Sequence, residues 1–216
     1  IGGVGGYVVE ALVRSGIGHF TIIDNDKVSL SNCNRQIIAT TKTVGLDKVD
    51  VMKERILSIN PDAIVDTYKC FFLPENQDQF DFTHFDYVVD AIDTVSGKIA
   101  IILKAKKENI PIISSMGTGN KLNPMAFIVS DIYKTEMDPL AKVMRHELKK
   151  RHVKKLKVVY SKEKPIEPLI NEDTKKEIAN TSRRSVPGSN AFVPPAAGLL
   201  IASEVVKDLT SAKKED

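Results

Sequence analysis

A polar segment, residues 24–36, follows directly after the apolar run at residues 20–23, and it constrains the fold more than any other stretch. The segment contains two acids, an arginine and several amide side chains, and the run before it has the composition of a buried strand. In open α/β sheets, ligands bind in the crevice outside the carboxyl ends of the strands. The segment therefore predicts an α/β fold in which these polar groups face a ligand.

A glycine-rich run, residues 2–6, precedes the acid Asp24 by about twenty residues, the separation between a glycine turn and a ribose-binding acid in nucleotide-binding folds. Gly2, Gly3 and Gly5 let the backbone approach a phosphate, and the helix that follows offers free N–H groups and its positive end. A carboxylate such as Asp24 accepts hydrogen bonds from ribose hydroxyls. This spacing alone fits NAD as well as ATP.

Cations near the polar segment favour ATP over a dinucleotide. Arg35 presents a planar fork that suits phosphate oxygens, and Lys48 adds a point charge. Lys48 falls in the first turn of an expected helix, where a cation opposes the helix dipole, so its position is easier to understand if it faces an anion. A dinucleotide site needs neither this cation nor a second acid, and Asp26, Asn32 and Arg35 therefore indicate ATP.

Helical and strand patterns alternate along the chain. Apolar residues at helical spacing predict helices over residues 7–15, 45–59, 96–108, 137–151 and 196–209. Apolar or alternating runs predict strands over residues 19–24, 64–69, 87–92, 111–115 and 125–131, and an edge strand over 153–160, where lysines alternate with apolar residues. This order predicts a Rossmann-like α/β fold, a largely parallel sheet flanked by helices, with antiparallel strands in the later half.

The chain is expected to form a single domain over residues 1–216, with a flexible insertion around residues 161–190, which are rich in Lys, Glu, Pro and Ser. It opens on Ile1 inside the glycine turn, so we expect further sequence upstream. No apolar run is long enough to predict a membrane span. The two cysteines, Cys33 and Cys70, form no C-x-x-C pair, and so few cysteines favour a cytoplasmic location.

The glycine run at residues 2–6 and the polar segment at residues 24–36 resemble the ThiF/MoeB/ubiquitin-activating-enzyme superfamily. The pattern of that superfamily is a GxGGxG turn followed by D-x-D-x-V-x-x-S-N-x-x-R-Q. Lys48, the strand end at residues 90–93 and the stretch at residues 134–141 are similar to its tRNA threonylcarbamoyladenosine dehydratase branch. The resemblance covers residues 1–157 and resumes in the last helix. It implies a ThiF-type ATP-binding domain.

The resemblance also implies a role for each candidate residue. Arg35 and Lys48 hold the ATP phosphates, and Asp93 binds a Mg²⁺ ion that bridges them, because Mg²⁺ typically takes one or two carboxylates together with phosphate oxygens and water. Arg35, Lys48 and Asp93 are therefore the catalytic candidates, since they stabilise charge during phosphate chemistry. The residues assigned to ATP are Gly2, Gly3, Gly5, Asp24, Asp26, Asn32, Arg35 and Lys48.

No cysteine follows Cys70, although activators that pass their product to a thiol need one in the later half of the chain. The simpler reaction is that ATP activates a carboxylate and a neighbouring group on the same substrate displaces the activated ester. The resemblance implies such a reaction, an ATP-dependent dehydration that cyclises threonylcarbamoyladenosine in tRNA. The alternatives are adenylation of the C-terminus of a ubiquitin-like or sulfur-carrier protein, an NAD-dependent oxidoreductase, and a non-catalytic relative that binds RNA or protein.

Positive charge is concentrated between residues 142 and 157, which hold eight Lys or Arg residues and one acid, Glu147, within a chain of net charge +3. This basic segment is a candidate surface for an RNA backbone, mainly through phosphate contacts. The resemblance implies a tRNA anticodon loop as substrate and a homodimer, and it leaves a sulfur-relay or carrier-protein partner open. The basic residues are Lys142, Arg145, Lys149, Lys150, Arg151, Lys154, Lys155 and Lys157.

Overall fold

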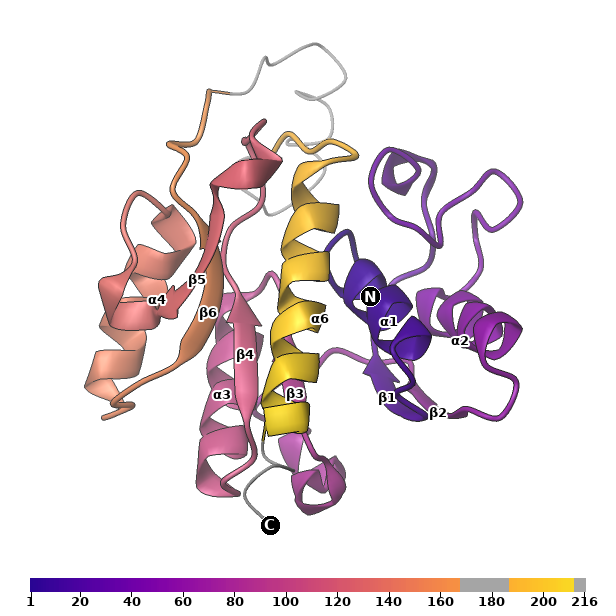
Figure 1. Cartoon of the computed structure of the whole chain (residues 1–216), viewed down its shortest axis with the longest axis horizontal. Coiled ribbons are helices and arrows are strands. Elements are labelled where there is room, and N and C mark those ends of the chain that lie inside the picture. The colour runs from indigo at the N-terminus through magenta and orange to yellow at the C-terminus, as the bar shows by residue number, and fades with distance from the viewer. Residues whose placement is uncertain (168–186, 212–216) are drawn as a thin grey trace.

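The computed structural model describes residues 1–167 and 187–211, and strands alternate with helices along them (Figure 1). The elements are α1 (Gly5–Arg14), β1 (His19–Ile23), α2 (Lys48–Ile59), β2 (Ile64–Tyr68), β3 (Val88–Asp90), α3 (Val95–Lys107), β4 (Ile112–Ser115), β5 (Phe127–Asp131), α4 (Pro139–Lys150), β6 (Lys157–Ser161) and α6 (Val193–Ser211). Each predicted helix and strand has a counterpart here, with ends that shift by a few residues.

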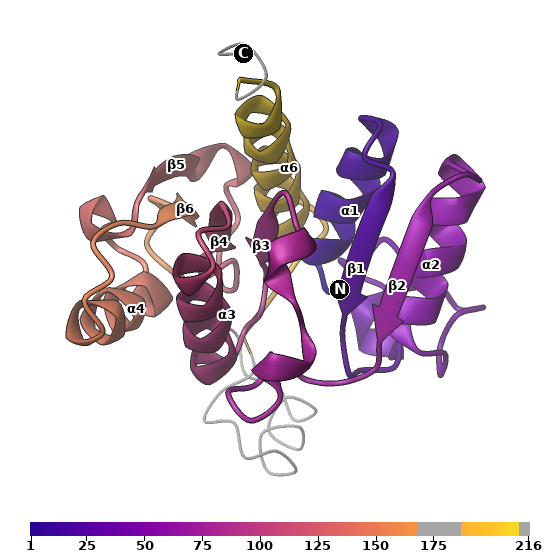
Figure 2. The same cartoon turned by 90° about the horizontal axis from the view of Figure 1, so that it is seen from below.

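The strands form two hydrogen-bonded groups. β1 pairs in parallel with β2, and β3, β4, β6 and β5 lie side by side in that order. β3, β4 and β6 are parallel, whereas β5 runs antiparallel to β6. Figure 2 shows α3 and α4 on one face of the four strands and α6 on the other. This arrangement confirms the predicted Rossmann-like fold, with its antiparallel pairing in the later half.

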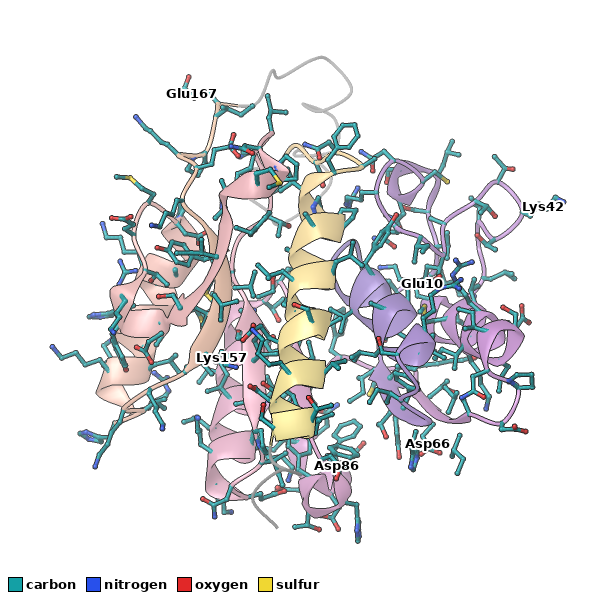
Figure 3. The ribbon with its side chains drawn as sticks, in the orientation of Figure 1. Glu10, Lys42, Asp66, Asp86, Lys157 and Glu167 are labelled. Carbon is teal, nitrogen blue, oxygen red and sulfur yellow. The ribbon has the colours of Figure 1, made fainter. Side chains whose placement is uncertain are left out.

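The prediction of an edge strand over residues 153–160 is wrong. β6 begins only at Lys157, lies between β4 and β5, and is buried along the rest of its length. The lysine at its start, Lys157 (labelled in Figure 3), is only partly buried. Its Nζ lies 3.1 Å from Glu204 and 2.7 Å from Asp208, both on α6. The alternation of lysine and apolar residues therefore reflects a buried strand with an ion pair at its first residue.

Two buried apolar clusters hold the helices against the strands. One joins α1, α2, β1 and α6, and the other packs α3 and α4 against β4 and β6. α1 and α6 approach so closely that a Cβ atom on Gly198 would lie 2.6 Å from the carbonyl oxygen of Val4. Gly198 thus lets the last helix pack directly against the segment that leads from the glycine turn into α1.

The last helix begins at Val193 rather than at residue 196. Pro194 and Pro195 occupy its first turn, where the missing N–H groups have no helical partner in any case. Of the expected insertion, residues 168–186 lie outside the described residues, and its flexibility stays a prediction, as does the single-domain organisation. In the two described ranges, no helix is long and apolar enough to cross a membrane.

Candidate nucleotide site

The glycine turn lies where three other parts of the chain meet. A Cβ atom on Gly5 would lie 3.5 Å from that of Ala91, which follows β3. On Gly3, a Cβ atom would lie 3.0 Å from that of Pro194 in α6 and 3.4 Å from Cγ of Arg35. The turn is therefore lined by the end of β3, by the segment carrying Arg35 and by the start of α6, and larger residues at Gly3 would close this space.

Lys48 joins the two acids that follow β1. Its Nζ lies 2.7 Å from Oδ2 of Asp26 and 3.9 Å from Oδ1 of Asp24, and its side chain is only 6% exposed. The backbone N–H of Asp26 donates to Oδ1 of Asp24 at 2.8 Å, which fixes the two carboxylates relative to each other. Lys48 lies in the first turn of α2, as predicted, although the helix begins at Lys48 and not at residue 45. The structure thus brings three predicted site residues into contact.

The side chain of Asp24 is 13% exposed. Burial favours its neutral form, whereas the positive charge of Lys48 and the hydrogen bond from the backbone N–H of Asp26 lower the pKa of the carboxyl. Both neighbours therefore favour the ionised carboxylate. In that form both of its oxygens accept hydrogen bonds, as a ribose ligand requires.

Arg35 is half-buried, and its stem lies along the glycine turn. Nη1 donates to the carbonyl oxygen of Ser31 at 3.1 Å and to Oδ1 of Asn34 at 2.9 Å. Both hydrogen bonds that the Arg35 side chain makes to described residues use Nη1. Nε and Nη2 are therefore available to an oxyanion. Burial lowers the pKa of Arg35, yet a guanidinium keeps its charge at neutral pH.

Asn32 and Gln36 shape the backbone around Arg35. The side chain of Asn32 is buried, and its Oδ1 accepts a hydrogen bond from the N–H of Ser29 at 3.1 Å. Gln36, which sequence reasoning did not select, is also buried, and its Nε2 lies 3.9 Å from where a Cβ of Gly2 would be. Within the described residues, its Oε1 has no hydrogen-bond partner. The only sequence signal for Gln36 is that it follows Arg35 in the R-Q pair that ends the superfamily pattern.

Asp93 lies in the loop that follows β3 and is exposed, whereas Asp90, three residues earlier, is fully buried. Across the described ranges, no group of three His, Cys, Asp or Glu side chains could hold a metal ion. The chemistry of the Asp93 carboxylate fits a Mg²⁺ ion that keeps phosphate oxygens and water as its other ligands. The loop also adjoins the glycine turn through Ala91.

The basic segment is split by the fold into paired and exposed residues. Four of its eight cations are engaged: Arg145 donates to Thr135, Lys157 pairs with acids of α6, and Lys150 and Arg151 both pair with Glu147. The other four are exposed: Lys142, Lys149, Lys154 and Lys155. The charge that remains for a ligand is therefore smaller than the sequence indicates.

Two lysines of α3 extend this surface. Lys106 and Lys107 lie in the last turn of α3 and are exposed. The exposed side chain of Lys106 is still partly covered by its neighbours, which lowers its pKa, and the charge of Lys155 lowers the pKa further, so the two segments lie close together. We call Lys106, Lys107, Lys149, Lys154 and Lys155 the basic edge. α3 starts just after the carboxyl end of β3, so its last turn, and with it the basic edge, lies toward the amino ends of the strands, away from the glycine turn (Figure 1).

The parallel strands, the crossover helices and the glycine turn that leads into α1 define a Rossmann-like α/β protein. The chain belongs to the ThiF family, whose model matches residues 1–216. The superfamily resemblance predicted from the residues is thereby confirmed.

Similar proteins narrow this assignment. The chain is 46% identical over 215 residues to the tRNA threonylcarbamoyladenosine dehydratase of Bacillus subtilis (strain 168), which covers 97% of this chain and 84% of that protein. The Escherichia coli (strain K12) protein of the same name is 44% identical over 149 residues, 69% of this chain and 56% of that protein. The crystal structure of E. coli TcdA in complex with ATP matches with a TM-score of 0.88 and 34% identity over 100% of this chain and 85% of that one.

Proposed function

We propose that this chain is an ATP-dependent tRNA threonylcarbamoyladenosine dehydratase. The observation that carries the proposal is its 46% identity, over 97% of its length, to a dehydratase of that name. The E. coli dehydratase with the matching fold has been crystallised with ATP and with AMP. Here Lys48, held by Asp26, and Arg35, which lies along the glycine turn, supply positive charge that can bind the phosphates of such a ligand.

The proposed reaction has two steps. A carboxylate oxygen of the threonylcarbamoyl group attacks a phosphorus atom of ATP, and that phosphorus loses its bond to pyrophosphate, for attack at the α-phosphorus, or to ADP, for attack at the γ-phosphorus. An N–H or O–H group of the same side chain then attacks the activated carbonyl carbon and gives up its proton. The ring closes, and AMP or phosphate leaves with the former carboxylate oxygen, so that the substrate loses one water. Because the nucleophile is already tethered to the substrate, the protein needs only to position it.

The residues near the glycine turn divide this work. Asp24 is ionised and binds the ribose hydroxyls, while Arg35 and Lys48 place positive charge on the phosphates as negative charge shifts during the attack. Asp26 holds Lys48 in place at 2.7 Å. Asp93 holds a Mg²⁺ ion, which when bound neutralises phosphate charge.

The test uses the full-length protein with tRNA that carries threonylcarbamoyladenosine. ATP consumption is measured with modified tRNA, with unmodified tRNA and with a ubiquitin-like carrier protein. We expect turnover only with modified tRNA, together with loss of 18 mass units, one water, from the nucleoside. Turnover with the carrier protein alone would establish the alternative reaction instead. The products, either AMP and pyrophosphate or ADP and phosphate, identify the activated intermediate.

The basic edge is proposed to bind the tRNA backbone at a distance from the modified nucleotide. The 12 residues of α4 separate its two ends by about 18 Å. Lys149 lies in its last turn, and Lys154 and Lys155 follow it, so all three are at the end remote from the start of the helix. Changing Lys149, Lys154 and Lys155 to Glu should weaken tRNA binding, and the slope of log affinity against log salt should become shallower by about 0.7–0.9 per lost contact. ATP affinity should not change, because the basic edge is remote from the glycine turn.

The matched control for the basic edge changes three cations elsewhere to Glu: Lys42 and Arg14, which are exposed, and Lys53, which is partly exposed. Both triple variants lower the net charge equally, so a loss of tRNA binding in both would indicate a nonspecific charge effect. Titrations from about 50 to 200 mM salt separate the outcomes. An unaltered slope in the basic-edge variant refutes its contact with tRNA.

A homodimer is proposed from the resemblance and from exposed apolar side chains around the start of α6. Phe192 directly precedes α6 and Leu199 lies in its second turn, and their side chains are 66% and 50% exposed. Met125 and Leu122, 88% and 63% exposed, belong to the neighbouring segment around the turn Pro124–Ala126. Contiguous exposed apolar surface of this kind marks interaction sites.

Sedimentation should therefore show a dimer at micromolar concentration. The double change Phe192→Glu and Leu199→Glu should shift the protein to monomer, because it places charge in the apolar contact. Ile64→Glu, at a residue on β2 that is 60% exposed, is the control and should leave the dimer intact. A monomeric wild-type protein contradicts the proposal.

A further inference from the structure

A lysine and an aspartate are fully buried beside the candidate nucleotide site but belong to none of the groups assigned to ATP. Lys98 lies in the first turn of α3 and Asp90 ends β3, and both side chains are 0% exposed. Nζ of Lys98 lies 3.0 Å from Oδ2 of Asp90. Burying two charges costs so much solvation that such a pair often stabilises a fold no more than apolar residues of equal volume would. Stability alone therefore does not account for it.

The ammonium of Lys98 makes two further hydrogen bonds, both to backbone carbonyl groups. It donates to the oxygen of Ile92 at 3.0 Å and to the oxygen of Ser115 at 2.7 Å. Together with the ion pair to Asp90, these two bonds hold the ammonium in a fixed position. Ser115 is the last residue of β4, and Ile92 immediately precedes Asp93. Lys98 therefore ties the loop that carries Asp93 to the neighbouring strand.

Asp90 adds a second restraint on Ile92. Its Oδ1 accepts the N–H of Ile92 at 3.1 Å, while its Oδ2 accepts the hydroxyl of Ser114 at 2.5 Å. The N–H and the carbonyl group of Ile92 are thus both held by the buried pair. The residue directly before Asp93 is therefore restrained at both its N–H and its carbonyl group.

We propose that Lys98, through its pair with Asp90, is a positioning residue that holds Asp93 where it meets the metal of a bound Mg²⁺–ATP complex. This inference rests on the proposed function, because that function places ATP and Mg²⁺ at the glycine turn. Groups that orient a metal ligand without touching the metal typically change metal affinity by about 10–100-fold when they are removed. Lys98 should therefore govern affinity for the metal and not for the nucleotide.

The decisive variant is the double change Asp90→Asn and Lys98→Met. Lys98→Met alone leaves a buried, uncompensated carboxylate and should unfold readily. The double variant has no buried charge, and its Asn keeps an oxygen for the N–H of Ile92, but the carbonyl group of Ile92 loses its donor. We expect Mn²⁺, used as the probe, to bind the protein–ATP complex about 10–100-fold more weakly in electron paramagnetic resonance titrations. ATP affinity without metal should stay within about twofold of wild type.

Ser114→Ala is the matched control, because it removes a hydrogen bond to the same carboxylate from the β4 side and leaves Ile92 untouched. It should bind Mn²⁺ as wild type does. Equal Mn²⁺ affinities for wild type and a folded double variant overturn the role of Lys98. A wild-type protein that binds Mn²⁺–ATP but does not dehydrate tRNA overturns the proposed function and not this inference, so the two failures are distinguishable.

Hydrogen exchange in the wild-type protein tests the same inference without any substitution. If the buried pair holds the loop in advance, the amide of Ile92 should exchange as slowly as those of β3 before any nucleotide is added. It should slow little further with Mn²⁺–ATP. Fast exchange in the free protein, slowed only by Mn²⁺–ATP, would show that the ligand orders the loop and would overturn the proposal even if the double variant does not fold.

Discussion

Replacing Arg35 by alanine is expected to reduce ATP-dependent turnover by at least about 100-fold, the loss that follows removal of one donor to a developing charge. Arg35 keeps Nε and Nη2 available while Nη1 is held by Ser31 and Asn34, so its fork is already oriented before a phosphate arrives. The melting temperature should fall by no more than about 4 °C, because only a half-buried stem along Gly3 is lost. Coupled ATP-turnover assays and thermal melts measure the two effects.

Two further variants separate geometry from charge. Arg35→Lys keeps the positive charge but lacks the planar fork, so its activity should lie between those of wild type and Arg35→Ala. Arg14→Ala is the control for removing an arginine, since Arg14 is 58% exposed and pairs only with Glu10 among the described residues. It should turn over ATP at the wild-type rate. Full activity in Arg35→Ala would remove Arg35 from the site.

The alternation of helix and strand was predictable because each element is buried on a face that its own periodicity marks. The order of strands was less accessible. Residues 153–160 show the alternation of an edge strand, yet β6 lies between two other strands. Lys157 is tolerated there because it pairs with Glu204 and Asp208 on a helix about fifty residues further along the chain. A local pattern indicates which side chains are charged, but it does not indicate which distant acid pairs with them.

The candidate site shows the same division. Charged residues at strand ends and in first helical turns often face a ligand, and this is why four site residues could be selected from the sequence: Asp24, Asp26, Arg35 and Lys48. The structure places two of them, Asp26 and Lys48, in contact. Lys98 was not selected, because a lysine in a helix pattern looks like a solvated one. The available signal was Asp90, an acid inside an apolar run, which needs a buried partner.

Lys121, in the loop after β4, was also missed, because nothing in its sequence neighbourhood marks it as buried. Its side chain is 1% exposed and pairs at 2.7 Å with Asp138, whose side chain also caps α4. The stretch at residues 134–141, which narrowed the resemblance, therefore contains a residue that fixes the start of a helix and the loop after β4. Sequence similarity identified the stretch, but only the packed structure shows that Asp138 acts inside the protein.

Replacing Lys48 by methionine is expected to weaken ATP binding by roughly 10–150-fold, the equivalent of a charged hydrogen bond worth about 1.5–3 kcal/mol. Lys48 is the only cation within 4 Å of Asp26 in the described part of the chain, and its side chain is 6% exposed. Methionine has a similar length and keeps the start of α2 packed. It leaves two carboxylates, Asp24 and Asp26, that repel each other and repel the phosphates.

The loss should therefore grow with the charge of the ligand. Adenosine should bind Lys48→Met within a few fold of wild type, AMP more weakly, and ATP weakest of all, as isothermal titration can measure. Adding Asp26→Asn removes one negative charge beside the phosphates and should recover part of the ATP affinity. Lys27→Met, at a lysine 66% exposed that pairs with Asp47 at 3.6 Å, is the matched control and should bind all three ligands normally. An equal loss for adenosine and ATP would show that Lys48 supports the fold around the site and does not bind phosphate.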